Sequence, residues 1–338
     1  MKAVLVKSGK GGISDLYIGE TENPTPSSGD VIVKIKAFGL NRMDILQRRG
    51  GYPVPAGAST VLGVEFSGHV TEVGSGVSEW KINDEVFGLA SGGAYAEYIK
   101  VPATHLISKP AHLSWVEAAS VPEMWITAYQ ALVVIGKVKA GDNVLVHAGA
   151  SGVGIAVSQL ARLYGAKNVI ATASSKEKLD NLVNLPGGIG PTHGVNYKTQ
   201  DFAEEVKNIT GGVGANVVID FVGQSHWHKN MAALAVDGHM TMLGLLSGGE
   251  VESFNLGIIL YKRLHIEGST LRSRSVAYQT ELIAGFKRDV VGHLTNFEGT
   301  GKLRTIIHSV VYSWTDIQAA HQEMEDDKNI GKIIVEIS

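Results

Sequence analysis

The 338-residue chain contains no cysteine. This absence excludes disulfide bonds, thiolate zinc sites and thiol nucleophiles, so any catalysis depends on other side chains. It leaves the redox compartment open, because a chain without thiols folds in either environment.

Long apolar runs and a large excess of charge of one sign are also missing. No apolar segment approaches the roughly 20 residues that a membrane helix needs. The N-terminal MKAVLVKSGKGG predicts a strand and a turn and does not have the pattern of a signal peptide. The formal net charge is −3, with acidic and basic residues interspersed, which argues against nucleic-acid partners. We therefore expect a soluble, cytoplasmic protein with neither membrane nor nucleic acid as a partner.

The hydrophobic fraction of 44% is sufficient for two ordinary buried cores. Residues 1–121 contain short β-branched runs between Gly and Pro clusters and predict a mostly β domain. The pattern Ser114-x-x-Glu117 is a capping box that opens an apolar helix, interrupted at Pro122. Residues 122–262 then alternate strands and helices, which predicts parallel βαβ units in a doubly wound α/β sheet.

Residues 263–338 are mixed again. They predict a helix near 277–291 and strands over 305–311 and 332–337. The economical interpretation is a parallel-sheet domain inserted into a mostly β domain, which the C-terminal part returns to complete.

The stretch VLVHAGASGVGIAVSQLARLYGA, residues 144–166, predicts a strand, a glycine-rich turn and a helix. Gly149, Gly152 and Gly154 would let backbone N–H groups approach a pyrophosphate at the helix N-terminus. The motif G-x-G-x-x-G is incomplete, because Val157 stands where its last glycine belongs. The strand-turn-helix context nevertheless favours a dinucleotide site over an ordinary tight turn.

The end of the next predicted strand carries no acidic residue, although a carboxylate there is typical of NAD sites. Its sequence, Thr-Ala-Ser-Ser-Lys-Glu-Lys over residues 172–178, offers hydroxyl and ammonium groups to a 2′-phosphate. Ser174 and Lys178 therefore favour NADPH as cofactor, with Tyr197 against the adenosine half. The alternatives are structural: Ser174-x-x-Glu177 is also a capping box, and Tyr197 could be a packing residue.

Several stretches together resemble the zinc-independent quinone oxidoreductases of the medium-chain dehydrogenase/reductase superfamily, which are related to zeta-crystallin. The likeness covers nearly the whole chain, and it is greatest to the animal NADPH quinone reductase subgroup that is inducible by a tumour suppressor. The stretches are GLNRMDILQRRGGYP, LGVEFSGHVTEVGSGV, VPEMWITAYQAL, HAGASGVG, VNYK, LRSR and KNIGKI.

This resemblance implies a GroES-like β domain flanking a Rossmann domain, a cleft between the two, and a homodimer joined along the cofactor-domain sheet. It places three residues at the nicotinamide and substrate end, namely Asn41, Asp44 and Tyr52. It assigns cofactor contacts to Thr127, Gly152, Val153, Gly154, Ser174, Lys178, Tyr197, Val222, Gly244 and Asn329, and it suggests that residues 271–274 close over the nicotinamide. The connection over residues 185–195 is longer than its family counterpart, so the alignment is uncertain there.

The resemblance also bears on metals. Zinc-dependent relatives use a cysteine and a histidine where this chain has Asn41 and Val64, neither of which can replace those ligands. We therefore expect no metal. Without a Lewis acid, hydride transfer to a simple carbonyl loses several kcal/mol of stabilisation, which favours an electron-poor acceptor such as a quinone.

The leading hypothesis is an NADPH-dependent quinone reductase in which Asn41 and Tyr52 orient the acceptor. A close alternative is reduction of α,β-unsaturated aldehydes or ketones, which needs a proton donor such as Tyr52. A third hypothesis is a non-catalytic, crystallin-like NADPH-binding protein. The sequence does not distinguish one-electron from two-electron reduction.

Overall fold

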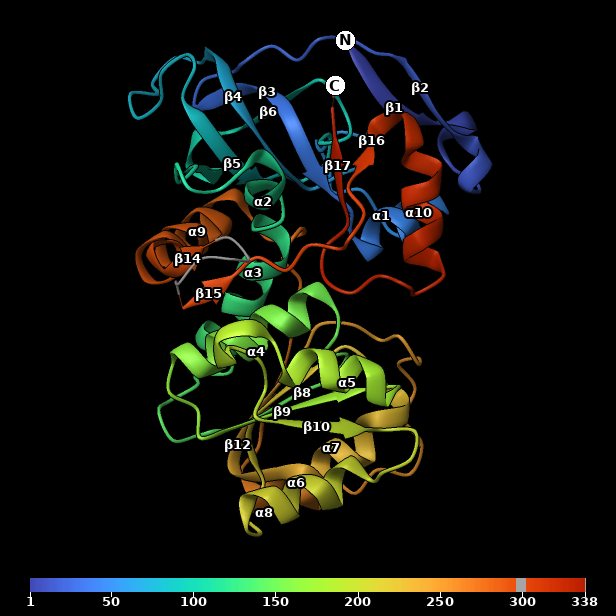
Figure 1. Cartoon of the computed structure of the whole chain (residues 1–338), viewed down its shortest axis with the longest axis vertical. Coiled ribbons are helices and arrows are strands. Elements are labelled where there is room, and N and C mark those ends of the chain that lie inside the picture. The colour runs from blue at the N-terminus through green and yellow to red at the C-terminus, as the bar shows by residue number, and fades with distance from the viewer. Residues whose placement is uncertain (296–301, 338) are drawn as a thin grey trace. The chain divides into compact units, whose positions relative to one another are not determined.

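The computed structural model describes residues 1–295 and 302–337, which fold into two compact units (Figure 1). Unit 1 holds Met1–Ile126 and most of the chain after Leu271, and unit 2 holds Thr127–Thr270 together with Leu303–Arg304. The sequence pattern placed the two boundaries between the domains after residues 121 and 262. Because the chain leaves unit 1 and later returns to it, the predicted insertion of one domain into the other is confirmed.

The main sheet of unit 1 has the strand order β16-β17-β3-β4-β5-β7, and β6 also pairs with β3. The returning strand β17 lies antiparallel to β3, with Val335 opposite Phe38. The C-terminal segment therefore completes a sheet begun near the N-terminus, and β1 and β2 form a separate antiparallel pair. The strands of unit 1 are β1 (Lys2–Val6), β2 (Leu16–Glu20), β3 (Asp30–Gly39), β4 (Glu65–Val73), β5 (Glu85–Leu89), β6 (Tyr98–Pro102), β7 (Leu106–Ser108), β14 (Leu294–Thr295), β16 (Tyr312–Ser313) and β17 (Ile334–Glu336).

Short helices accompany this sheet. Ser114 and Glu117 form the predicted capping box, in which each side chain accepts a hydrogen bond from the other residue's backbone N–H. The apolar helix also breaks at Pro122 as predicted, because proline lacks the N–H that would continue it. The α-helices are α1 (Arg42–Arg48), α2 (Trp115–Ala119), α3 (Pro122–Tyr129), α9 (Val276–Asp289) and α10 (Ile317–Glu325), and shorter helical turns span Lys7–Gly9, Ile13–Asp15, Ala103–His105, Val291–His293 and Trp314–Asp316.

Unit 2 is a parallel sheet in the order β10-β9-β8-β11-β12-β13. The order reverses between β8 and β11, where doubly wound sheets bind ligands beyond the carboxyl ends of their strands. The strands are β8 (Asn143–Val146), β9 (Asn168–Ala173), β10 (His193–Asn196), β11 (Ala215–Asp220), β12 (Leu234–Met242), β13 (His265–Gly268) and β15 (Leu303–Arg304). The helices are α4 (Gly152–Leu163), α5 (Lys176–Val183), α6 (Phe202–Thr210), α7 (Trp227–Ala233) and α8 (Gly257–Lys262), with a π-type turn at Gln130–Ile135 and short turns at Pro186–Gly188 and Gln224–His226.

One predicted strand is wrong. Residues 305–311 are β-branched and apolar, but within the described chain they make only an isolated bridge, Ile307 with Lys332. A strand needs a continuous partner, and β17, which begins at Ile334, pairs instead with β3 and β16.

Among the described residues, no helix combines the length and the hydrophobicity that crossing a bilayer requires.

Candidate functional site

The loop between β8 and α4 leaves almost no room for side chains. A Cβ on Gly154 would stand 2.5 Å from the carbonyl oxygen of Ala148, and one on Gly149 would stand 2.8 Å from the Cβ of Ala171. Ala148 has a φ of 46°, which is strained for a residue other than glycine. The loop thus holds its backbone in one tight conformation before a 12-residue helix.

The first turn of α4 presents backbone N–H groups. Ser151 Oγ caps the helix by accepting from the Gly154 N–H at 3.1 Å. The N–H groups of Gly152 and Val153 have no acceptor within the helix, as is general for first-turn residues. The positive end of the helix dipole adds to them, so this turn is suited to a negatively charged group.

The turn after β9 differs from the prediction in its cap. Ser175, not Ser174, caps α5, and its Oγ accepts from the Lys178 N–H at 3.3 Å. The reason is that β9 continues to Ala173, so Ser174 completes the turn before the helix can start. The capping explanation for Ser174 is therefore wrong. Ser174 and Lys178 are both half-buried.

Tyr197 follows β10, is 38% exposed and packs edge-on against His226, with ring centroids 5.4 Å apart. Behind His226 lies His147, 4.7 Å away between ring centroids. His147 is fully buried and both ring nitrogens have partners, Thr172 Oγ1 at 2.9 Å and Asn230 Oδ1 at 2.7 Å. Burial lowers the pKa of each histidine to about 4. His147 is therefore a neutral core histidine with both ring nitrogens hydrogen-bonded.

Val222 and Gly244 lie just beyond the carboxyl ends of β11 and β12. The buried Asp220 fixes the first of these loops, because its Oδ1 accepts from the Val222 N–H at 2.8 Å. A Cβ on Gly244 would stand 3.1 Å from the carbonyl oxygen of Phe221, so the two loops run close together. The hydroxyl of Thr127, in α3, is buried and has no hydrogen-bond partner.

A second polar cluster lies in unit 1, centred on the fully buried Glu65 at the start of β4. Its Oε1 accepts from Asn41 Nδ2 at 2.8 Å and pairs with Lys332 Nζ at 2.5 Å. Its Oε2 accepts from the Glu123 N–H at 2.8 Å. Lys332 also donates to Asn41 Oδ1, so ammonium, amide and carboxylate form a closed triangle.

Asp44, also fully buried, stands beside this triangle. Its carboxylate accepts from the N–H groups of Asn41 at 2.8 Å and Gly63 at 3.1 Å, and from the Tyr95 hydroxyl at 3.3 Å. Burial raises its pKa to about 6 against the lowering effects of these N–H groups and of Lys332.

The hydrogen bonds behind Tyr95 have a defined direction. Arg48 Nη1 lies 3.0 Å from His321 Nδ1, and a guanidinium can only donate, so Nδ1 is the acceptor. The proton of the neutral imidazole then sits on Nε2, 3.3 Å from the Tyr95 oxygen. The Tyr95 O–H is left to donate to Asp44. Burial, with the charge of Arg48, lowers the pKa of His321 to about 3 and keeps it neutral.

Arg272 is 3% exposed and is held by two acceptors, the Ser91 carbonyl oxygen to Nε at 2.8 Å and Gln47 Oε1 to Nη1 at 2.7 Å. Its Nη2 is buried without a hydrogen-bond partner. The guanidinium carbon lies 5.6 Å from the ring centroid of Tyr52. Burial raises the pKa of Tyr52, and the charge of Glu123 adds to this effect.

Glu123, in the first turn of α3, is 6% exposed. Burial, reinforced by the neighbouring carboxylate of Glu65, raises its pKa to about 8 despite the nearby Lys332. The side chain is therefore mostly protonated at neutral pH.

The structure brings together Asn41 and Asp44, and it places Tyr52 within electrostatic range of Glu123. Asn329 is elsewhere in unit 1, where its amide donates to the Gly331 carbonyl at 2.9 Å. Sequence reasoning included Arg272 only within the segment 271–274 and missed three other residues of the cluster, each a charged side chain set in or beside an apolar stretch, which was the available signal. They are Glu65, Glu123 and Lys332.

Comparisons with known proteins identify the family. Residues 27–111 match the model of the alcohol dehydrogenase GroES-like domain, and residues 152–288 match that of the zinc-binding dehydrogenase. The synaptic vesicle membrane protein VAT-1 homolog of Danio rerio is 32% identical over 345 residues, covering 98% of this chain and 69% of that protein. The chain belongs to the medium-chain dehydrogenase/reductase superfamily.

Solved structures of the superfamily share this fold. Escherichia coli quinone oxidoreductase complexed with NADPH superposes with a TM-score of 0.81 at 28% identity, covering 99% of each chain. CurK enoyl reductase superposes with a TM-score of 0.84 at 28% identity, covering 100% of this chain and 99% of that one. The α/β fold with a GroES-like domain and a Rossmann domain is confirmed, and the protein is an oxidoreductase of this superfamily.

The residues of unit 2 fit the dinucleotide of such oxidoreductases. The tight glycine loop admits no Cβ at Gly154, the first-turn N–H groups of α4 suit a pyrophosphate, and the buried Thr127 hydroxyl lacks a partner.

The surroundings of Asn41, which stands at a zinc-ligand position of the superfamily, do not have the charge of a metal site. Lys332 places a positive charge between Asn41 and Glu65, where it would repel a metal cation. Among the described residues, no group of three or more His, Asp or Glu side chains is arranged to hold a metal ion.

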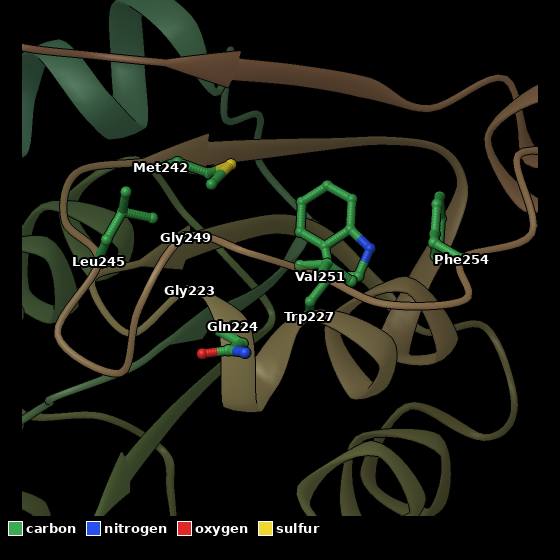
Figure 2. Close-up of a pocket in the computed structure, with 8 residues that line it drawn as sticks. All are labelled: Gly223, Gln224, Trp227, Met242, Leu245, Gly249, Val251 and Phe254. Carbon is green, nitrogen blue, oxygen red and sulfur yellow. The ribbon is translucent and has the colours of Figure 1, made fainter.

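Unit 2 also has an apolar hollow of about 350 Å³ beside the loop that follows β12 (Figure 2). Trp227 and Phe254 meet edge-on there, with ring centroids 5.3 Å apart. The hollow does not include Val222 or Gly244. Its lining residues are Gly223, Gln224, Trp227, Met242, Leu245, Gly249, Val251 and Phe254.

Proposed function

We propose that this protein is an NADPH-dependent quinone oxidoreductase that works without a metal ion. The observation that carries the proposal is the triangle of Asn41, Glu65 and Lys332, in which an ammonium group binds Asn41, the residue that stands where zinc-dependent relatives have a cysteine ligand. The similarity to Escherichia coli quinone oxidoreductase, whose structure is complexed with NADPH, supports it.

Unit 2 would bind the cofactor. Gly152 and Val153 hold the pyrophosphate by their backbone N–H groups, and Gly154, which has no room for a Cβ, lets the loop close around it. Ser174 and Lys178 hold the 2′-phosphate, against which an acidic residue would be repulsive. When bound, NADPH supplies a hydride to the acceptor. The remaining contacts are assigned to Thr127, Tyr197, Val222, Gly244 and Asn329.

Unit 1 would bind the acceptor. Without a Lewis acid, several kcal/mol of carbonyl stabilisation are absent, so the acceptor must itself tolerate the negative charge that hydride brings. A quinone does so by delocalising the charge over its ring. Asn41 and Tyr52 orient it, and Asp44 fixes the position of Asn41 through the backbone N–H.

Reduction of α,β-unsaturated carbonyl compounds is the second candidate. The observation that favours it is the superposition on CurK enoyl reductase. Hydride addition to a β-carbon also needs a proton donor, which the half-buried Tyr52 could supply.

The test is to mix the purified protein with NADPH and panels of quinones and enones while following the absorbance of the reduced cofactor. Faster oxidation with quinones supports the proposal, and faster oxidation with enones supports the second candidate. Thermal stabilisation by NADPH without turnover of any acceptor would instead favour a cofactor-binding protein with no catalytic role.

We further propose a homodimer joined along the sheet of unit 2. Strand β13 ends the sheet order, and an edge strand is a template for pairing with a second copy. The adjacent helix α8 exposes Leu260 by 70% and Tyr261 by 81%, and Leu256, just before it, by 71%. Such apolar exposure is typical of an interface.

A further inference from the structure

The guanidinium of Arg272 is built to donate one more hydrogen bond than the protein uses. Ser91 and Gln47 fix two of its nitrogens, while Nη2 is buried and unpartnered. Gln47 is itself anchored, since its Nε2 donates to the Thr60 carbonyl at 3.1 Å. A buried donor without a partner costs about 1–3 kcal/mol, which a bound ligand oxygen would recover.

Glu123 is a protonated acid within electrostatic range of that guanidinium. Two carboxylates, Glu65 and Asp44, and two cations, Lys332 and Arg272, act on it. If all three carboxyl groups were ionised, this buried cluster would carry a net negative charge, which is costly in a low-dielectric interior. The carboxyl group of Glu65 already has partners of its own, Lys332 and Asn41.

Among the described residues, the carboxyl oxygens of Glu123 take part in no hydrogen bond, and the residue contributes only its backbone N–H to Glu65. Tyr52 is half-buried, and the charges of Glu123 and Arg272 both act on its pKa, the first raising it and the second lowering it. The same polar cluster thus contains two groups that can donate a hydrogen bond but have no acceptor in the protein: the carboxylic acid of Glu123 and Nη2 of Arg272.

Resting on the proposed function, we propose that Arg272 and Glu123 act on the oxygen of the acceptor. Arg272 Nη2 donates a hydrogen bond to the carbonyl oxygen, on which charge develops as the acceptor takes up a hydride and its two electrons. The O–H bond of Glu123 then breaks and a new O–H bond forms on that oxygen, which gives a neutral enol. With a quinone this enol is a tautomer of the hydroquinone, which forms when the ring carbon that received the hydride loses a proton to water and the second carbonyl oxygen takes a proton from water. The Glu123 carboxylate takes its next proton from water.

This assignment defines the acceptor class. The acceptor must carry a carbonyl oxygen conjugated to the carbon that receives the hydride, as in quinones and enones, because both catalytic residues act on oxygen.

The first test compares Glu123→Gln with wild type in quinone reduction. We expect kcat to fall about 10²-fold at neutral pH, the usual size of a general-acid effect, with the Kd for NADPH unchanged. In the wild type kcat should also fall above about pH 8, where Glu123 loses its proton, and in the variant this alkaline limb should disappear. Glu281→Gln, exposed on α9, is the matched control. A variant with the kcat and pH profile of the wild type overturns the role of Glu123.

Arg272→Lys keeps the charge and removes the fork of donors, so kcat/KM should fall about 10²-fold, as for loss of one oxyanion donor. Arg162→Gln, on the exposed face of α4, is its control. Unchanged kcat/KM in Arg272→Lys overturns the role of the guanidinium.

A readout without turnover separates this inference from the proposed function. The infrared spectrum of the wild type at neutral pH should contain a carboxylic-acid C=O band that is absent from Glu123→Gln and present in Glu281→Gln. If no acceptor is reduced, the proposed function fails, and the band still decides whether Glu123 stores a proton. If Glu123→Gln has the same carboxylic-acid bands as the wild type, the inference is overturned, even in an active enzyme.

Discussion

Individual buried charges define the chemistry of this protein more than its composition does. Glu65 pairs with Lys332, whereas the pKa of Glu123, a neighbour in the same cluster, is raised to about 8. The difference comes from their partners, since Glu65 accepts three hydrogen bonds or ion pairs and Glu123 accepts none among the described residues.

The raised pKa of Glu123 predicts a pH-dependent stability effect. Folding raises this pKa from 4.5 to about 8, so the folded state binds the extra proton and the free energy of unfolding falls as pH rises through this window. Glu123→Gln removes that dependence. In thermal unfolding, the Tm of the variant relative to wild type should therefore rise from pH 5 to pH 8. A Tm difference that stays constant with pH would contradict the assignment.

Lys178 tests the choice of cofactor. Lys178→Ala should weaken NADPH binding far more than NADH binding, because only NADPH has the 2′-phosphate that the ammonium is proposed to pair with. Titration of each cofactor by fluorescence measures both Kd values. Lys176→Ala, exposed on the same helix, is the matched control. Equal losses for the two cofactors would show that Lys178 does not recognise the phosphate.

At the scale of elements, the loop between β8 and α4 packs so tightly that Gly149 and Gly154 have no room for a Cβ. Ser151 caps the helix, Ala148 takes the strained backbone conformation, and Gly154 lets the loop close on the helix. The loop therefore keeps its tight conformation although the glycine motif is incomplete. Val157, which replaces the last glycine of the motif, is a buried core residue of α4 and lies outside the loop.

Gly154→Ala should therefore damage the cradle. Its Cβ would meet the Ala148 carbonyl oxygen at 2.5 Å, so the loop must shift and the N–H groups must leave their positions. We expect NADPH affinity to fall by at least about tenfold, or about 1.4 kcal/mol. Gly292→Ala, where a Cβ meets nothing within 4 Å, is the control. Isothermal titration calorimetry with unchanged affinity in Gly154→Ala would contradict this account.

At the scale of the whole molecule, the chain builds one unit from two distant segments and places the other between them. β17 pairs with β3 only after unit 2 has been completed in sequence. The segment that returns to unit 1 contains Lys332, which pairs with Glu65, and Arg272, which donates to Gln47. The polar cluster of unit 1 therefore cannot form until the chain has come back.

The proposed homodimer is tested at this scale. Tyr261→Glu places a charge on the exposed apolar surface of α8, and burying an unpaired charge in an interface is costly. Light scattering after size exclusion should give twice the chain mass for the wild type and the mass of one chain for the variant. Val213→Glu, also exposed in unit 2, should remain dimeric. A wild type that is monomeric at all concentrations would refute the proposal.

The sequence by itself determined the order of the elements and the nucleotide loop. Hydrophobic period and glycine spacing are local, so the alternation of strands and helices after residue 122 and the strand, turn and helix within residues 144–166 were predicted, and the structure has β8 and α4 there. The cradle glycines were found for the same reason, because one strand-to-helix turn contains all of them. The Ser174 cap and the strand over 305–311 were wrong where a neighbouring strand, not local propensity, set the boundary.

Only the tertiary structure decided the ionisation of the polar cluster. Glu65, Glu123, Arg272 and Lys332 come from four separate segments, and nothing local in the sequence indicates which acid is paired and which stays protonated. Charge state depends on burial and on the distance to other charges, and both exist only after distant segments have packed together.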